Sequence, residues 1–484
     1  MKDMRLKKVV TALAMCLLLT IVLSLNAQET KKNRVIILTD VENEPDDSES
    51  LVRLVLYSNV IDIKGIIATT SVHMKNDVHP ETIHRIISAY EKVQPNLLKH
   101  EEGFPDAASL QLLVKSGLPE YGMNGVGDGK DSEGSEWIIK ILEENDPRPL
   151  WVCAWGGPNT LAQALYKIRK TRSATDAAKL IGKLRIYTIS DQDDSGNWMR
   201  KNFPGLFYIV SPGGYDTSTW GAINQYFQGI NNETVSNSWL AENIQQNHGP
   251  LGAVYPDVAY GMEGDTPSFL ALIPNGLNYP EHPEWGGWGG RYEFYQPDNS
   301  SLNRKGFTGG VPVEPETRPI WTNAADRYTP YISSEYGQAT RRDTVTFNSN
   351  KATLFRWRDD FQNDFAARMD WCTKSFQEAN HPPVPVLTTP DMITVKSGDT
   401  FTLRASATTD PDGDNLSFLW FQYPEAGSYK GMLRFSQVEN IYRIICTAPQ
   451  IDKPETVHII LKVTDKGTPP LTRYKRVIVN ILPN

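Results

Sequence analysis

An acidic segment lies near the beginning of the chain, where Asp40–Glu49 contains six carboxylates and no lysine or arginine. Carboxylates that converge raise one another's pKa unless a cation lies between them. Ca²⁺ prefers carboxylate and carbonyl oxygens of this kind. The alternative is a solvated acidic loop that opens a helix, and the helix dipole alone would favour Glu44 and Glu49 there. We expect a cation site, with Glu44 and Glu49 outside it, because the segment directly follows a buried strand.

The elements that must position this segment are visible in the apolar pattern. Five continuous apolar runs predict strands that are buried on both faces of a sheet, at Arg34–Thr39, Ile61–Thr69, Leu150–Ala154, Leu184–Ser190 and Leu206–Ser211. Apolar residues at helical spacing predict helices at Ser48–Ser58, Glu81–Val93, Thr160–Lys170 and Phe361–Phe376. This alternation predicts an α/β domain at residues 33–378, with a mostly parallel sheet covered by helices on both sides.

Polar or flexible residues directly follow three of the predicted strands. Asp40, Gly156 and Asp191 each lie just past a strand end. In open α/β sheets, ligands bind outside the carboxyl ends of the strands. We therefore expect these three loops to converge on one crevice.

The pattern changes after residue 378. Residues 379–385 include His381-Pro382-Pro383-Val384-Pro385, where paired prolines exclude a helix and predict an extended linker. Residues 386–484 contain short β-type runs separated by turn signals, and we interpret Asp410–Asn415 as an Asp-Gly turn. About 100 residues of short strands are typical of a small all-β immunoglobulin-like sandwich.

The N-terminus predicts export. A basic segment, Lys2–Lys8, precedes the apolar run Val9–Leu25, and a small residue at Ala27 completes a signal peptide over residues 1–27. A retained membrane anchor is the alternative, because the apolar run is longer than usual. After cleavage no further membrane span is expected, so the protein would be periplasmic or extracellular. The net charge of -8 argues against a nucleic-acid partner, which needs a basic face.

The acidic segment matches a known pattern. Asp40-Val-Glu42-Asn-Glu-Pro-Asp46-Asp47 resembles the signature Asp-x-Asp-x-x-x-Asp-Asp of nucleoside hydrolases. Three later segments agree in order, namely Trp155–Thr160, Gly196-Asn197 and Glu263–Pro267. With the C-terminal sandwich, the chain resembles a family of cellulose-binding proteins that have a nucleoside-hydrolase-like domain.

This resemblance implies roles for individual residues. It implies Ca²⁺ as a cofactor, with ligands from Asp40 or Glu42, Asp47, the backbone carbonyl of Gly156, and Asp265. Glu42 would be the general base that takes a proton from the attacking water, and Asp46 and Asn197 would bind sugar hydroxyls. Glu42 departs from the Asp of the family. Gly264 stands where several members carry a histidine that protonates the leaving base, so we expect another glycoside rather than a nucleoside.

Further sugar contacts are expected outside the acidic segment. His73 follows the second strand, and Trp198 follows Asn197. Trp285 and Trp288 lie in the glycine-rich stretch Tyr279–Tyr292, where they would form a stacking platform for a sugar or, alternatively, a structural plug.

Two functions remain open from the sequence. The first is an exported Ca²⁺-dependent glycoside hydrolase that acts on a glycosidic or N-glycosidic bond of a carbohydrate. The alternative is a non-catalytic carbohydrate-binding protein, with cellulose as the candidate ligand, that uses the same fold. The expected partner in both cases is a carbohydrate or glycoside, and the sequence leaves a homo-oligomer open.

Overall fold

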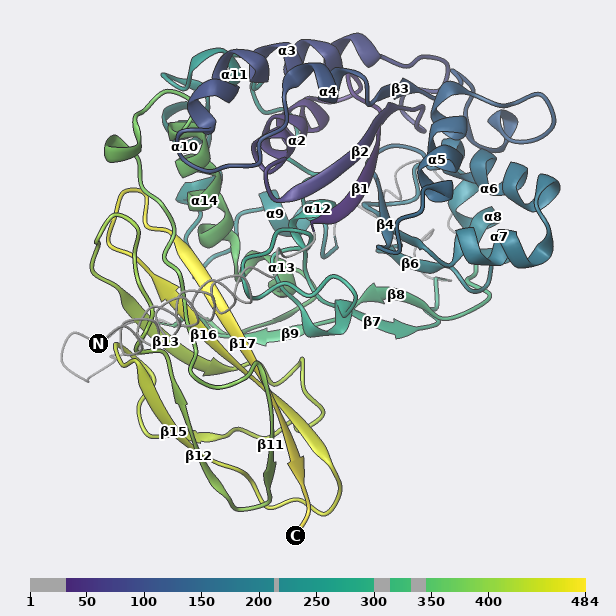
Figure 1. Cartoon of the computed structure of the whole chain (residues 1–484). Helices are drawn as coiled ribbons and strands as arrows, with labels where there is room; N and C mark the ends of the chain where they lie inside the picture. The colour runs from purple at the N-terminus through teal and green to yellow at the C-terminus, as the bar shows by residue number, and fades with distance from the viewer. Residues whose placement is uncertain (1–31, 213–216, 300–313, 332–344) are drawn as a thin grey trace, which may run out of the picture.

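The computed structural model describes residues 32–212, 217–299, 314–331 and 345–484, and it contains two domains that pack against each other (Figure 1). The predicted signal peptide, residues 1–27, lies outside the described residues. Within the described ranges, no helix combines the length and the apolar composition needed to cross a membrane.

The first domain is built on an eight-stranded sheet with the order β3-β2-β1-β4-β5-β6-β8-β7. All neighbouring strands are parallel except β7, which runs antiparallel to β8. The prediction of an α/β domain with a mostly parallel sheet is therefore confirmed. The strands are β1 (Asn33–Thr39), β2 (Ile61–Ala68), β3 (Val114–Ser116), β4 (Leu150–Ala154), β5 (Leu184–Thr188), β6 (Phe207–Val210), β7 (Tyr292–Tyr295) and β8 (Ile320–Asn323).

Helices cover both faces of this sheet and form two separate hydrophobic cores (Figure 1). One face is covered by α2 (Pro45–Leu56), α3 (Pro80–Leu97), α4 (Ala107–Gln111) and α14 (Arg358–Asp370). The other is covered by α5 (Glu133–Glu143), α6 (Asn159–Thr171), α7 (Ala174–Ile181) and α8 (Ser195–Asn202). The predicted closing helix thus begins and ends earlier than Phe361–Phe376.

Short elements fill the loop-rich part of this domain. The short helices are η1 (Gly122–Gly125), α9 (Trp220–Asn224), η3 (Glu233–Val235), α10 (Asn237–Leu240), η4 (Ala241–Gln245), α11 (Gly249–Ala253), α12 (Pro267–Leu270), η5 (Pro283–Trp285), α13 (Ala352–Phe355) and η7 (Phe376–Glu378). A two-stranded sheet pairs β9 (Asp326–Tyr328) with β10 (Phe347–Ser349).

The second domain consists of two small sheets that enclose a separate core, as the sequence predicts. The first sheet has the order β11-β17-β16-β13 and the second β12-β15-β14. Their strands are β11 (Met392–Lys396), β12 (Thr400–Arg404), β13 (Ser417–Gln422), β14 (Arg434–Phe435), β15 (Arg443–Thr447), β16 (Glu455–Thr464) and β17 (Thr472–Leu482). Trp420 of β13 is completely buried in this core.

Ion pairs between α14 and β16–β17 join the two domains. Lys462 Nζ lies 2.7 Å from Asp360 Oδ1, and Arg473 Nη1 lies 2.6 Å from Asp364 Oδ1. Tyr474 also donates a hydrogen bond to Asp360. The second domain is therefore docked on the first rather than tethered only through the proline-rich segment.

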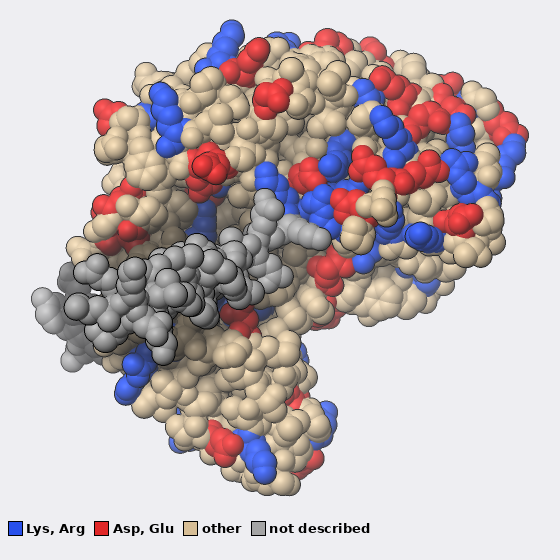
Figure 2. All heavy atoms as spheres, viewed as in Figure 1, with Lys and Arg blue, Asp and Glu red and all other residues tan. Residues whose placement is uncertain are grey.

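Charged side chains of both signs intermingle over the surface of the first domain that is seen in Figure 2. The visible face of the second domain is mostly uncharged in the same view. That face of the molecule shows no single-sign field of the kind that steers a highly charged partner.

Candidate functional site

Four buried aspartates lie together at the carboxyl ends of the strands. Asp40 follows β1, Asp46 and Asp47 lie in the first turn of α2, and Asp265 lies in the loop before α12. Each of the four is at most 5% exposed. Carboxylate oxygens of Asp46, Asp47 and Asp265 all lie within 4.8 Å of one another. The structure thus brings three predicted ligands, Asp40, Asp47 and Asp265, together with Asp46, which the resemblance assigns to a sugar hydroxyl.

Hydrogen bonds from neighbouring elements orient two of these carboxylates. Thr39 Oγ1, at the end of β1, donates to Asp47 Oδ1. Trp220 Nε1, at the start of α9, donates to Asp46 Oδ2 at 3.2 Å. Both aspartates are therefore held by donors that come from outside their own helix.

Gly156 borders the site next to Asp40. A Cβ atom at position 156 would lie only 2.7 Å from Asp40 Oδ1, so a side chain there would displace the carboxylate. The other oxygen, Asp40 Oδ2, is buried and has no hydrogen-bond partner among the described residues. Buried carboxylate oxygens are rarely left without a partner, and a cation would satisfy this one.

A buried ion pair holds the loop that carries Asp265. Arg53 of α2 donates from Nη2 to Glu263 Oε1 at 3.0 Å, and both side chains are completely buried. The backbone N–H of Glu263 donates to Glu49 Oε2 at 2.7 Å. Glu49 therefore supports the site without joining the aspartates. Helix α2 and the Asp265 loop are fixed to each other by these contacts.

Burial and mutual repulsion raise the pKa of the aspartates. Burial, followed by the neighbouring carboxylates, raises the pKa of Asp47 and Asp265 well above the usual value. Burial, followed by the charges of Glu44 and Asp40, raises the pKa of Asp46 to about 7. Within the described part of the chain, no lysine or arginine forms an ion pair with these four aspartates. An all-oxygen site with this much unbalanced negative charge fits Ca²⁺.

Glu42 points away from this site, which corrects the prediction that it binds the metal and acts as the general base. The N–H of Asn43 donates to the carbonyl of Asp40 at 3.0 Å and closes a tight turn in which Glu42 has a φ of 81°. The turn directs Glu42 toward α3, where Thr82 and Arg85 donate hydrogen bonds to its carboxylate. Sequence spacing does not reveal this, because a left-handed residue in a turn changes the direction of the side chain.

Glu44 and His73 lie beside Asp40 at the rim of the site. Glu44 is the half-buried N-cap residue of α2, and its side chain makes no capping hydrogen bond. Burial raises the pKa of Glu44, the charge of His73 opposes this shift, and the charge of Asp40 adds to it. Glu44 is thus a half-buried carboxylate that interacts electrostatically with Asp40, Asp46, Asp47 and Asp265, which differs from the expectation that it lies outside the site. The available signal was Pro45, which favours the first turn of a helix and so marks Glu44 as its N-cap.

Trp220 occupies the space beside Gly264. A Cβ atom at position 264 would lie 1.9 Å from Trp220 Cδ1 and 2.6 Å from Asp46 Oδ2. No larger side chain fits there while Trp220 keeps its place. The position at which several nucleoside hydrolases carry a histidine is therefore filled by an indole ring, and no motif in the sequence links Trp220 to this position.

The comparisons with known proteins agree with this architecture. Residues 34–292 match the family model described as cellulose-binding Sde182, nucleoside hydrolase-like domain. The chain belongs to the Sde182 family. Residues 400–481 match the C-terminal domain of the cellulose-binding protein Sde0182.

A solved structure supports the Sde182 assignment. It is a nucleoside hydrolase-related protein from Saccharophagus degradans that is described as associated with carbohydrate metabolism. It shares 37% sequence identity with this chain at a TM-score of 0.77, covering 93% of this chain and 100% of that one. Two effector proteins show weaker similarity, and each match covers 71% of this chain and 95% of the effector. They are XOO4466, with 10% identity and a TM-score of 0.34, and the type III effector XopQ complexed with adenosine diphosphate ribose, with 11% identity and a TM-score of 0.33. Neither TM-score is high enough to support a common fold. No curated protein matches the chain.

In this Sde182-family chain, α8 places two predicted substrate residues differently. Asn197 Oδ1 is buried and has no hydrogen-bond partner among the described residues. The ring of Trp198 packs edge-on against Phe203 at 5.7 Å and lies under the guanidinium of Arg169. Trp198 therefore packs in the helix layer, which corrects its predicted role as a sugar contact.

The two tryptophans of the glycine-rich stretch pack between the domains. Trp288 is completely buried, and its Nε1 donates to Tyr474 Oη at 3.4 Å. Trp285 stacks on His282 with ring centres 3.8 Å apart and packs edge-on against His458 of the second domain. Trp288 is therefore a structural plug, which corrects its predicted role in a sugar-stacking platform, whereas Trp285 is only partly buried and its predicted sugar contact stays a prediction.

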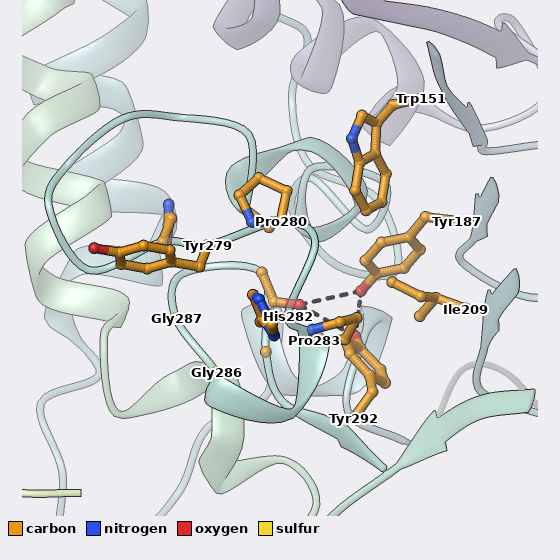
Figure 3. A pocket seen from close by; sticks show the side chains of 14 residues that line it. Trp151, Tyr187, Ile209, Tyr279, Pro280, His282, Pro283, Gly286, Gly287 and Tyr292 are labelled. Atoms are coloured by element: carbon orange, nitrogen blue, oxygen red, sulfur yellow. Dashed lines mark hydrogen bonds between the residues drawn. The ribbon is translucent and has the colours of Figure 1, made fainter. Parts of the chain in front are cut away.

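A small cavity lies beside the same stretch (Figure 3). Its wall includes Trp151 of β4 and Tyr187 of β5, and the hydroxyls of Tyr187 and Tyr292 share a hydrogen bond. The volume is about 20 Å³, far below the roughly 300–1,000 Å³ of small-molecule sites. None of the four strand-end aspartates lines this cavity, so it is distinct from the aspartate site.

Proposed function

We propose that this protein is an exported Ca²⁺-dependent glycoside hydrolase that cleaves a glycosidic or N-glycosidic bond of a carbohydrate at the strand-end aspartates. The observation that carries the proposal is the triad of Asp46, Asp47 and Asp265, three buried carboxylates within 4.8 Å of one another. The family is described as cellulose-binding, and the relative from Saccharophagus degradans as associated with carbohydrate metabolism, which supports a carbohydrate substrate. The signal-peptide pattern at residues 1–27 supports export.

The residues of the chain divide into those that hold the ion and those that act on the sugar. Asp46, Asp47 and Asp265 would hold Ca²⁺, with Asp40 beside them. Bound there, the ion would neutralise these carboxylates and attract the vicinal hydroxyls of a sugar ring.

Glu44 takes the role that the family pattern assigns to Glu42. It is the half-buried carboxylate beside Asp40, so it can reach both the site and solvent. Glu44 would accept the proton of the water that attacks the anomeric carbon as the glycosidic bond breaks, and the leaving group would take its proton from solvent water. Hydrogen bonds from the protein to the sugar hydroxyls would strengthen as positive charge develops on the ring. A general base of this kind typically contributes a factor of about 10²–10⁴ in rate.

A matched pair of variants tests this assignment. Glu44→Gln should lower the rate of hydrolysis on a panel of glycosides and glycans by about 10²–10⁴-fold. Glu42→Gln removes a carboxylate of the same length two positions earlier and should leave the rate nearly unchanged. EDTA and Asp47→Asn should abolish turnover. Equal losses in Glu42→Gln and Glu44→Gln would contradict the role of Glu44, and no turnover across the panel would contradict hydrolysis.

Gly264 and Trp220 favour a second candidate function, carbohydrate binding without catalysis. The space that a leaving-group acid would need is filled by the Trp220 ring. This candidate predicts that the protein is retained on insoluble cellulose in Ca²⁺ and released by EDTA, with no soluble sugar produced. Release of reducing sugar by the wild type but not by Asp47→Asn would instead support the hydrolase.

A further inference from the structure

A second acidic cluster lies at the junction of the two domains. Asp410, Asp412 and Asp414 lie in the loop between β12 and β13, and their carboxylate oxygens are all within 4.8 Å of one another. Asp465, directly after β16, is completely buried. Burial raises the pKa of Asp465, and the nearby charge of Asp410 adds to this shift. His381 of the interdomain segment donates its backbone N–H to Asp412 Oδ2 at 2.7 Å.

Three oxygens at this junction are buried without a hydrogen-bond partner in the described part of the chain: Asp410 Oδ2, Asp465 Oδ2 and Asn380 Oδ1. Asn380 is only 6% exposed and Asp465 is 0% exposed. Buried polar atoms are almost always paired, so three unpaired acceptors in one place call for a positively charged or donating partner.

The remaining polar atoms of the same side chains are already engaged. Asp410 Oδ1 accepts the backbone N–H groups of Asp412 at 2.9 Å and Asp414 at 3.0 Å. Asp465 Oδ1 accepts from Asn380 Nδ2 at 3.0 Å and from two backbone N–H groups. These contacts fix the three side chains so that each presents one free acceptor oxygen. An arrangement with only acceptors left free repels anions and attracts a hard cation.

No basic side chain balances this cluster. Among the described residues, Asp412 pairs with the His381 imidazole at 3.0 Å, and no lysine or arginine forms an ion pair with Asp410, Asp414 or Asp465. Ca²⁺ accepts about six to eight oxygen ligands in flexible geometry, whereas Mg²⁺ requires a near-octahedral set. Ligands drawn from two loops and an interdomain segment suit the more tolerant ion.

We propose that a Ca²⁺ ion binds at this junction and locks the second domain onto the first, with ligands from Asn380, Asp410, Asp412, Asp414 and Asp465. Asn380 lies in the interdomain segment directly after η7, whereas the four aspartates belong to the second domain. The ion would therefore tie the interdomain segment to the second domain at the point where the chain leaves the first domain. This site is independent of the strand-end aspartates and of the proposed hydrolysis.

Calcium stoichiometry tests the proposal. The full chain is stripped with EDTA, dialysed and titrated with Ca²⁺ in a calorimeter. The wild type should bind two ions, and Asp410→Asn and Asp46→Asn should each bind one. Asp452→Asn, an exposed aspartate of the second domain, is the control and should bind two. A wild type that binds one ion and an Asp410→Asn variant that binds none would still support the junction site, while counting against the strand-end site.

A second variant covers the case in which Asp410→Asn does not fold. Asp414 is less buried than Asp465, and Asp414→Asn should lower the affinity of one ion at least tenfold. Ca²⁺ should also raise the unfolding temperature of the second domain in the wild type and in Asp46→Asn, but not in Asp410→Asn or Asp414→Asn. Junction variants that keep the wild-type stoichiometry and affinity would overturn the proposal.

Discussion

Glu263→Gln should destabilise the protein by about 3–5 kcal/mol, because it leaves a buried guanidinium without its counter-charge. Arg53 is completely buried, and its Nε and Nη2 both donate to the Glu263 carboxylate. Glutamine keeps the size of the side chain, but its amide nitrogen cannot accept the second of these bonds. Arg53 cannot turn to solvent, because Nη1 is also held by the carbonyl of Phe361 at 3.0 Å.

Urea unfolding followed by tryptophan fluorescence measures this loss. Glu293→Gln is the matched control, because Glu293 is 56% exposed and pairs with Arg291 Nη1 at 2.9 Å. Arg291 is itself buried but keeps its bond to the buried Asp326, so losing the exposed Glu293 carboxylate should cost at most about 1 kcal/mol. A loss below about 1 kcal/mol in Glu263→Gln, or equal losses in the two variants, would refute the argument from burial.

Three further predictions follow from the site and its surroundings. In EDTA, thermal stability should fall as the pH rises from 3.8 to about 7, because the raised pKa of Asp46 lets the folded state keep a proton that the unfolded state releases. Scanning calorimetry should show that the unfolding temperature depends less steeply on pH in Asp46→Asn than in the wild type. An equally steep dependence in the two proteins would contradict this. Gly264→His should fold poorly, because the new Cβ would clash with Trp220. Adding Trp220→Ala to this variant should partly restore its soluble yield. A normal soluble yield of Gly264→His alone would contradict the expected clash. Trp288→Ala should lower the free energy of unfolding by about 3–5 kcal/mol and leave the sugar affinity of the folded protein unchanged. A loss of sugar binding without a loss of stability would instead show that Trp288 stacks on the sugar.

The sheet and its helices could be predicted from the sequence because buried parallel strands are continuous apolar runs. Leu150–Ala154 matches its predicted bounds, and β1 and β2 differ from theirs by one residue at one end. The convergence of Asp40 and Asp265, which are 225 positions apart, could be expected only through the family motif, since no local pattern links them.

Side-chain direction could not be predicted from spacing. The positive φ of Glu42 turns its carboxylate away from the site and leaves Glu44 there. A sequence motif does not specify the backbone angles of such a turn. Trp285 and Trp288 lie among glycines that suggested an exposed loop, but the second domain packs over them. Contacts made by another domain leave no periodic signal in the stretch that they bury.

A crystal structure of the protein grown with Ca²⁺ and a soluble oligosaccharide tests the central claim most directly. We predict anomalous density for a calcium ion held by carboxylates of Asp46, Asp47 and Asp265, with sugar hydroxyls at the ion and Glu44 facing the anomeric carbon. The absence of a cation from these three aspartates at saturating Ca²⁺, or a sugar bound elsewhere on the molecule, would contradict the claim.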